Sequence, residues 1–456
     1  MPEFKFKSEF SVPAKQLFSW HEGLGAFDRL NPPFMPVKLV AHDGHIRDGA
    51  NVVLKIPVVP PLGLRWTLEH HHYRQDQQFC DRQVSGPFHA WDHVHRFTDI
   101  GEDRCILEEH INYTWPLGFL TEKITDPVFR IKLQRLFQFR HRRTASDLEL
   151  HNKYSENGAL KFLIAGSSGM LGTELISFLS TGGHRVTRLV RGNNRQSPSW
   201  SPDTGRLNPD LLEDYDVIIN LAGENIGSGY WTKKKKQKIL ESRVSATNLL
   251  AQTIGKLTRP PRLFIVASAT GYYGNRFDEQ LTEKSAPGSG FLSSVVSEWE
   301  QASRRSTGRH IRTVNLRFGV ILGGRHDILA RLRPFFLSGL GTVPGSGSQY
   351  FPWIAVDDAI AAIYHTIYTD SIEGPVNVVA PEQVSSGIFF RKLGKVLRRP
   401  VFFKIPAPLI KAMLGEMGEA LFLHGAHVLP LKLQETGFNF QFPDLEDTFR
   451  FYLGRL

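Results

Sequence analysis

The sequence predicts two domains: an α+β unit over residues 1–150 and a doubly wound α/β domain with a parallel sheet over residues 160–404. Three observations predict this arrangement. Residues 1–150 contain short β-like runs divided by turn residues and closed by one long helical pattern. From Leu160 onward, short apolar strands alternate with helices, which is typical of a parallel sheet covered on both faces. The first of those strands runs into a glycine-rich turn.

The N-terminal elements follow from alternation and turn chemistry. A short helix is expected over residues 14–20. Six β-like runs follow, separated by the Gly, Pro and Asp residues that hairpins need, at residues 37–41, 51–56, 64–73, 79–84, 90–98 and 105–113. From residue 120 to about 148 the apolar period becomes helical. Residues 151–159 are polar and aperiodic, so we expect a linker there.

The second domain is expected to contain six parallel strands. They are the apolar runs at residues 161–165, 185–190, 216–220, 262–268, 312–317 and 376–379, and helical patterns lie between them. Residues 405–456 are expected to form a helical extension of this domain.

Composition places the chain among ordinary soluble globular proteins. Of its 456 residues, 41% are hydrophobic and 22% are charged. There is no uninterrupted apolar run of the roughly 18 residues that a membrane span needs, and the first residues lack the apolar core of a signal peptide. Only Cys80 and Cys105 are present, which favours a reducing, cytoplasmic compartment.

The positive charge is concentrated in the second domain. Residues 1–150 hold 19 basic and 19 acidic residues, so the whole net charge of +10 falls in the remainder. A basic nucleotide-binding domain suits a polyanionic cofactor, and nucleic acid is the competing interpretation. The lysine run at residues 233–236 is typical of a solvated helix face, and no basic and aromatic residues interleave as base stacking requires. We therefore expect no nucleic-acid partner.

The glycine-rich turn is the first functional motif. Residues 161–172 (KFLIAGSSGMLG) form a strand, a turn and the start of a helix. Gly166 permits the tight turn, Gly169 lets backbone N–H groups approach a pyrophosphate, and Gly172 lets the helix pack closely on the strand. The pyrophosphate would then lie at the positive end of the helix. The alternative is a strand–helix corner without a ligand; the flanking elements favour the cofactor.

The next strand indicates which cofactor. NAD-binding folds usually place an acidic residue about 20 positions downstream, where it binds the ribose hydroxyls. Residues 184–192 (HRVTRLVRG) contain no acid, and Arg191 stands at that position. Its guanidinium can pair with a 2′-phosphate, which a carboxylate would repel. The sequence therefore favours NADP(H), the alternative being a solvated arginine at the end of a strand.

Two further segments carry a family resemblance. Residues 216–223 (DVIINLAG) resemble the fourth-strand motif of extended and atypical short-chain dehydrogenase/reductases, and residues 266–274 (VASATGYYG) are similar to their catalytic-serine region. Further matches at 316–319, 345–349, 353–358 and 374–377 are similar to the nucleoside-diphosphate-sugar epimerase-like branch, the epimerase family. The resemblance spans roughly residues 160–453 and implies a Rossmann-like fold. Together with the glycine-rich turn and Arg191, it implies cofactor contacts from the loop after residues 216–220 and from the strand at 312–317. The expected contact residues are Gly166, Ser167, Ser168, Gly169, Met170, Leu171, Gly172, Arg191, Leu221, Ala222, Gly223 and Arg317.

The N-terminal unit resembles a different superfamily. Residues 79–97 (FCDRQVSGPFHAWDHVHRF) look like the START-like, or SRPBCC, ligand-binding superfamily. That resemblance implies a helix-grip fold, in which a curved antiparallel sheet wraps around a long C-terminal helix. It also implies a hydrophobic ligand.

The catalytic residues of the superfamily are incomplete here. A tyrosine and, four residues later, a lysine normally transfer the proton and hold the nicotinamide ribose. In residues 290–300 (GFLSSVVSEWE), Phe291 and Val295 occupy those positions, and neither can move a proton. Ser268 can still orient a carbonyl, and Tyr272 or Tyr273 either donates a proton or packs at the wall of the pocket. These three are the candidate catalytic residues.

Histidines and paired acids invite other interpretations. His93 and His95 alternate on one strand, so both can face one ion, as can members of the run at residues 70–72. A structural zinc site usually has four ligands, so we expect hydrogen-bonded histidines and no metal. Asp357 and Asp358 are expected to cap the helix that follows, with substrate contact as the alternative.

The sequence thus predicts an NADP(H)-binding oxidoreductase or epimerase-like enzyme acting on a small carbonyl or hydroxyl substrate. The alternative is a non-catalytic sensor of NADP(H) or of a hydrophobic ligand. Substrate, direction of reaction and oligomeric state do not follow from the sequence.

Overall fold

A computed structural model describes residues 2–456 apart from 60–61, 117, 193–196 and 305–310. The chain forms two compact units. The N-terminal unit comprises residues 1–158, 177–183 and 453–456, and the second unit comprises residues 159–176 and 184–452. Among the described residues, no helix is both long and apolar enough to cross a membrane.

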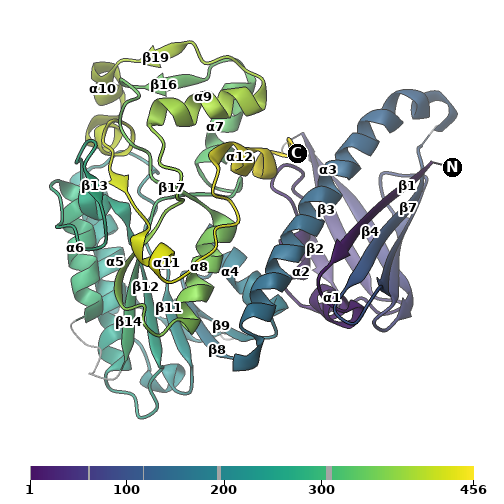
Figure 1. The fold of residues 1–456 in the computed structure, drawn as a ribbon, viewed down its shortest axis with the longest axis horizontal. Helices are drawn as coiled ribbons and strands as arrows, with labels where there is room; N and C mark the ends of the chain where they lie inside the picture. The colour runs from purple at the N-terminus through teal and green to yellow at the C-terminus, as the bar shows by residue number, and fades with distance from the viewer. Residues whose placement is uncertain (1, 60–61, 117, 193–196, 305–310) are drawn as a thin grey trace. The chain divides into compact units, whose positions relative to one another are not determined.

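The N-terminal unit is built on a seven-stranded antiparallel sheet (Figure 1). Its order is β1-β7-β6-β5-β4-β3-β2. Six of the strands lie where the sequence predicts them, and the opening segment with its alternating phenylalanines pairs with the last strand. The strands are β1 (Glu3–Phe10), β2 (Lys38–His42), β3 (Asn51–Val59), β4 (Leu62–Arg74), β5 (Gln78–Ser85), β6 (Ala90–Asp99) and β7 (Cys105–Thr114).

Three helices accompany this sheet: α1 (Ala14–Glu22), α2 (Ala26–Leu30) and α3 (Gly118–Lys153). The long helix continues five residues beyond its predicted end, into the expected linker. Residues 149–153 contain neither glycine nor proline, so polarity alone does not end it. The chain instead turns through a short 3-10 helix, Ser155–Asn157, and reaches Gly158 with a φ of +69°.

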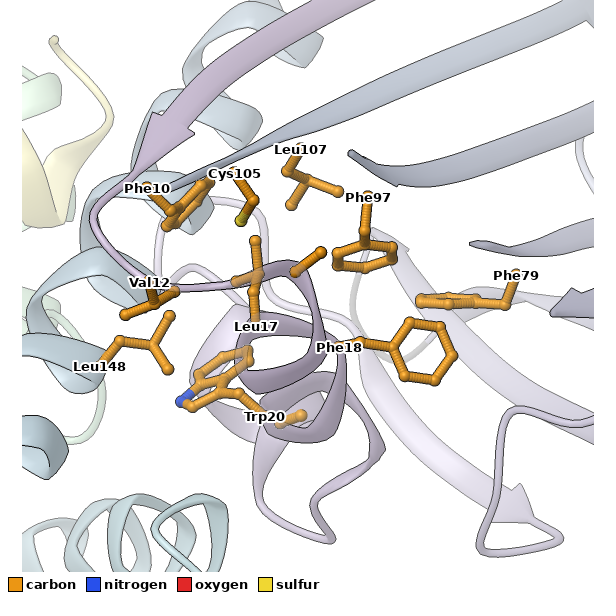
Figure 2. Close-up of a cluster of buried hydrophobic side chains, with 12 residues drawn as sticks. Phe10, Val12, Leu17, Phe18, Trp20, Phe79, Phe97, Cys105, Leu107 and Leu148 are labelled. Atoms are coloured by element: carbon orange, nitrogen blue, oxygen red, sulfur yellow. The ribbon is translucent and has the colours of Figure 1, made fainter. Parts of the chain in front are cut away.

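Two apolar clusters fill the space between this sheet and its helices. Figure 2 shows one of them, in which Leu17, Phe18 and Trp20 of α1 meet strand residues and Leu148 of α3. The other joins Leu133 and Phe137 of α3 to Trp91, Ile111 and Tyr113 of the sheet. The antiparallel sheet and the long helix therefore form one packed unit.

The second unit contains a seven-stranded parallel sheet of order β10-β9-β8-β11-β12-β14-β18. The order reverses after β8, which makes the sheet doubly wound and Rossmann-like, as predicted, and places the switch point between β8 and β11. The strands are β8 (Lys161–Ala165), β9 (Arg185–Arg191), β10 (Ser199–Trp200), β11 (Val217–Asn220), β12 (Leu263–Ala269), β14 (Arg312–Phe318) and β18 (Gly374–Val378). Its main helices are α4 (Met170–Thr181), α5 (Lys233–Ile254), α6 (Phe291–Arg304), α7 (Ile328–Leu337), α8 (Val356–Tyr368) and α9 (Ser386–Leu397).

The C-terminal segment contains strands as well as helices. Its helices are α10 (Ala407–Gly418), α11 (Leu431–Glu435) and α12 (Leu445–Leu453). Between them, β20 (His427–Val428) pairs with β13 (Gln280–Leu281) in parallel. Just before them, β19 (Phe403–Ile405) pairs with β16 (Thr342–Pro344). These pairings anchor the segment to loops that follow the central strands.

Candidate functional site

The turn after β8 is built around two glycines that the packing requires. Gly166 has a φ of +79°, and a Cβ there would lie 2.5 Å from the carbonyl carbon of Leu221. A Cβ on Gly172 would lie 2.5 Å from the carbonyl oxygen of Gly166. Any side chain at either position would displace backbone, so both glycines are needed to bring α4 against β8 and β11.

Gly169 differs from its neighbours because nothing in the protein requires a glycine there. Its φ is not positive, and among the described residues the only atom within 4 Å of an added Cβ is the Gly166 carbonyl oxygen, at an ordinary contact distance of 3.4 Å. The residue is exposed and immediately precedes α4. A glycine at this exposed helix N-terminus leaves room for a ligand that approaches the backbone, as the pyrophosphate does in Rossmann-type sites.

The loop after β11 faces this turn across the switch point. The buried Asn220 holds it: its side-chain oxygen accepts a hydrogen bond from the Ala222 N–H at 3.1 Å, and its amide donates to Thr247 at 2.9 Å. One turn of α5 secures the next residues, since Arg243 donates to the Glu224 carbonyl at 3.0 Å. Leu221, Ala222 and Gly223 are thus fixed in position, and Gly223 is exposed.

Arg191 is the last residue of β9 and is exposed. β9 pairs with β8 in parallel, so the carboxyl ends of both strands lie at one edge of the sheet. The Arg191 side chain therefore extends from the strand next to the glycine-rich turn. Ser168 is exposed, whereas Ser167 is buried within the turn.

Three polar residues stand in one row at the same edge. Ser268 of β12 pairs with Arg317 of β14, and Arg317 pairs with Asn377 of β18. All three are at most 4% exposed. Ser268 and Arg317 are candidates from the sequence, and Asn377 joins them through the register of the parallel strands.

A buried ion pair crosses this row. Glu300 of α6 is 2% exposed and accepts two hydrogen bonds from Arg317, Nε to Oε1 at 2.7 Å and Nη2 to Oε2 at 2.8 Å. Ser268 donates its hydroxyl proton to Glu300 Oε1 at 2.7 Å. The remaining nitrogen of Arg317, Nη1, donates to the Tyr273 hydroxyl at 2.9 Å. The sequence analysis assigned Arg317 to the cofactor, but each of its three guanidinium nitrogens donates a hydrogen bond to a protein side chain.

The two candidate tyrosines occupy different environments. Tyr273 is fully buried; its hydroxyl lies 2.7 Å from Asn377 Oδ1 and 3.0 Å from the Thr282 carbonyl, and burial raises its pKa to about 12. Tyr272 is half-buried, and its ring lies 3.5 Å from the Arg317 guanidinium carbon. The Tyr272 hydroxyl forms no hydrogen bond with any other described residue. Tyr272 is consequently the tyrosine whose proton is available.

The first turns of α6 carry no proton-transferring pair. Val295 is 2% exposed, and Phe291 is half-buried against Trp231, with ring centroids 5.2 Å apart. Lys236 of α5 lies over the Phe291 ring, with Nζ 4.5 Å from the centroid. The polar residue of α6 that reaches the row is instead Glu300. Pattern reasoning missed Glu300, although it stands five residues after Val295 on the helix the family uses for catalysis.

The sequence analysis expected Asp357 and Asp358 to cap α8, but they do not. The residue preceding the helix is Ala355. Asp358 accepts hydrogen bonds from the backbone N–H groups of Gln441 and Phe442 at 2.7 and 3.0 Å, and Asp357 accepts one from the Tyr452 hydroxyl at 2.7 Å. The two carboxylates therefore hold the C-terminal segment.

Comparison with known proteins identifies two matching families. The NAD dependent epimerase/dehydratase family matches residues 162–379. A domain of unknown function, DUF1731, matches residues 405–451.

Individual relatives extend this likeness. Epimerase family protein YfhF of Bacillus subtilis is 36% identical over 295 residues, covering 63% of this chain and 96% of the relative. A crystal structure of human epimerase family protein SDR39U1 with NADPH is 30% identical with a TM-score of 0.61, covering 65% of this chain and all of that one. A nucleoside-diphosphate sugar epimerase from Corynebacterium glutamicum is 29% identical with a TM-score of 0.81, and its likeness covers 99% of this chain and 90% of that one.

Proposed function

The chain belongs to the epimerase family, and on that premise we propose that it binds NADP(H) and transfers hydride between this cofactor and a small carbonyl or hydroxyl substrate. The observation that carries the proposal is Gly169, a glycine that the fold does not require, placed where a pyrophosphate would meet α4. Arg191 at the end of β9 supports NADP(H), because a guanidinium attracts the 2′-phosphate. The human relative crystallised with NADPH supports the same choice.

The substrate would lie over the carboxyl ends of the parallel strands, beside the nucleotide. The nicotinamide supplies the hydride when it is bound. Reduction of a carbonyl also needs a proton on the oxygen, and Tyr272 is the residue proposed to donate it. Arg317, held by Glu300, packs against the Tyr272 ring and fixes its position.

Ser268 and Tyr273 are proposed to position this site. Both hydroxyls are committed to hydrogen bonds within the buried row, which orders the loop that carries Tyr272. A fixed ring places one hydroxyl near the reacting oxygen, which is where orientation contributes to the rate.

A Tyr272→Phe variant tests the assignment of the proton donor. It removes the hydroxyl and keeps the ring over Arg317. We expect NADPH oxidation with a panel of aldehydes, ketones and quinones to fall by about 100-fold or more, the usual contribution of general acid catalysis, with the Kd for NADPH unchanged. Tyr215→Phe is the matched control, because Tyr215 precedes β11 at the opposite edge of the sheet, and it should keep the wild-type rate. An unchanged rate in Tyr272→Phe would reject Tyr272 as the donor.

A second candidate function is a sensor that binds NADP(H) without turning it over. Phe291 and Val295 favour it, because the usual tyrosine and lysine are missing from α6. The N-terminal unit, with its antiparallel sheet and long helix, is proposed to be START-like and to take a hydrophobic ligand. A sensor requires the two ligands to change each other's affinity by the same factor. NADPH binding without turnover, together with such a reciprocal shift, would favour the sensor over the enzyme.

A further inference from the structure

The inner face of the N-terminal sheet carries a buried cluster of imidazoles and carboxylates. Asp81 of β5 pairs with His93 of β6, and His95 of β6 pairs with Glu109 of β7. Because side chains alternate along a strand, these four residues share one face. All are buried, with exposures of 7%, 4%, 8% and 2%. His141 of α3, 5% exposed, approaches them from above the sheet.

The contacts around Asp81 have the spacing of ligands that share an ion. Asp81 Oδ2 lies 3.4 Å from His93 Nδ1 and is hydrogen-bonded to His95 Nε2 at 3.2 Å. Charge-assisted hydrogen bonds between these atom types are shorter, about 2.7 to 2.9 Å. Two donor atoms on a tetrahedral Zn²⁺ stand about 3.3 to 3.4 Å apart, because each bond is about 2.0 to 2.1 Å long. The donor atoms of the three residues all lie within 4.8 Å of one another.

The contacts on the far side of the two imidazoles are short. His93 Nε2 hydrogen-bonds to Glu109 Oε2 at 2.8 Å, and His95 Nδ1 lies 2.7 Å from the same oxygen. His141 Nε2 is 3.3 Å from the other oxygen of Glu109. Metal-binding histidines usually present one nitrogen to the ion and the other to a carboxylate, which fixes the ring and raises its basicity. Glu109 holds that second position for His93 through a hydrogen bond and lies at ion-pair distance from His95.

The charges of the cluster also favour a bound cation. Among the described residues, neither Asp81 nor Glu109 forms an ion pair with a lysine or an arginine. Two buried carboxylates need compensation, because an unpaired buried charge is very costly. A divalent cation with two neutral imidazoles supplies it. A metal-free cluster instead needs a proton on every nitrogen that faces the two carboxylates.

A further imidazole lies on the neighbouring strand. His70 of β4 pairs with Asp81 and is 8% exposed, and its Nδ1 is buried without a hydrogen-bond partner. Phe79 stacks on His95 with ring centroids 4.1 Å apart and covers the cluster from the side. Imidazole nitrogens with one carboxylate are a donor set that suits first-row transition metals.

We propose that Asp81, His93 and His95 bind one divalent first-row transition-metal ion, with Glu109 as the carboxylate that orients the imidazoles. The sequence analysis favoured no metal because a structural zinc site usually has four ligands. The fold adds Asp81 and Glu109 from neighbouring strands. The site is separate from the nucleotide site and does not depend on the proposed function.

Zn²⁺ binding to the full chain tests this proposal. After treatment with a chelator and its removal, titration against a chromophoric competitor should give about one tightly bound Zn²⁺ per chain. His95→Ala and Asp81→Asn should weaken binding by more than about 100-fold, and Glu109→Gln by about 10- to 100-fold, the usual effect of losing such an orienting carboxylate. Circular dichroism of each variant separates loss of the site from loss of the fold.

The matched control changes a different group of residues. His71, His72 and Cys80 form a second cluster of potential donors that is partly exposed. The double variant His71→Gln/His72→Gln should keep the tight Zn²⁺ site. Co²⁺ in the wild type should show the visible absorption of a four-coordinate site, and His95→Ala should abolish it. Absence of stoichiometric binding, or loss of binding only in the His71/His72 variant, would overturn the proposal.

Discussion

A Gly169→Ala variant is expected to fold normally and to lose roughly 10- to 100-fold in affinity for NADPH, because forcing a methyl group into a filled space costs about 1–3 kcal/mol. The added methyl meets nothing in the protein closer than the Gly166 carbonyl oxygen at 3.4 Å. It lies at the start of α4, where the pyrophosphate is proposed to bind. Affinity is measured by quenching of tryptophan fluorescence during NADPH titration, and folding by thermal denaturation.

The controls for this variant are other glycines. Gly101→Ala places a methyl where no atom lies within 4 Å, so it should change neither the Tm nor the affinity. Gly172→Ala brings a Cβ to 2.5 Å from backbone and should lower the Tm itself. If Gly169→Ala bound NADPH as tightly as the wild type, the pyrophosphate would not lie at this helix.

Glu300→Gln is expected to destabilise the second unit by about 3–5 kcal/mol, the usual cost of removing one partner from a buried ion pair. Arg317 is 1% exposed and would keep a charge with no carboxylate beside it. Ser268 would lose the same acceptor. Urea denaturation followed by circular dichroism measures the change in the free energy of unfolding.

The same helix supplies the control for this measurement. Glu298→Gln changes an exposed residue two positions earlier on α6 and should alter stability by no more than about 0.5 kcal/mol. The double variant Glu300→Gln/Arg317→Met should be less destabilised than the sum of the two single variants, because it leaves no unpaired charge. If Glu300→Gln lowered the free energy of unfolding by less than about 1 kcal/mol, the Glu300–Arg317 ion pair would not be what holds the row of polar residues together.

Much of the fold follows from local pattern. The predicted strand at 161–165 coincides with β8, and the run at 105–113 differs from β7 by one residue, because apolar alternation and turn residues act over a few positions. The glycine-rich turn was equally readable, because the strand, its three glycines and the start of the helix all lie within residues 161–172. The end of α3 could not be predicted in this way, because the polar residues there suggest a linker although the helix continues.

The remaining site residues depend on register and tertiary contact. Glu300 meets Arg317 only because α6 packs over β14, and no spacing in the sequence encodes that contact. Asp81 and Glu109 join His93 through cross-strand pairing, which a single strand's pattern does not reveal. Asp358 looked like a helix cap because its partners, Gln441 and Phe442, lie about 80 residues away in the chain.

The central claim is that the second unit binds NADP(H) through Arg191. Measuring the affinities for NADPH and for NADH, in the wild type and in Arg191→Ala, tests this claim most directly. A charged hydrogen bond to the 2′-phosphate is worth about 1.5–3 kcal/mol, so NADPH should bind roughly 10- to 100-fold more tightly than NADH. Arg191→Ala should abolish that preference and leave the affinity for NADH unchanged. Equal affinity for the two nucleotides in the wild type, or a preference that survives in Arg191→Ala, would contradict the account.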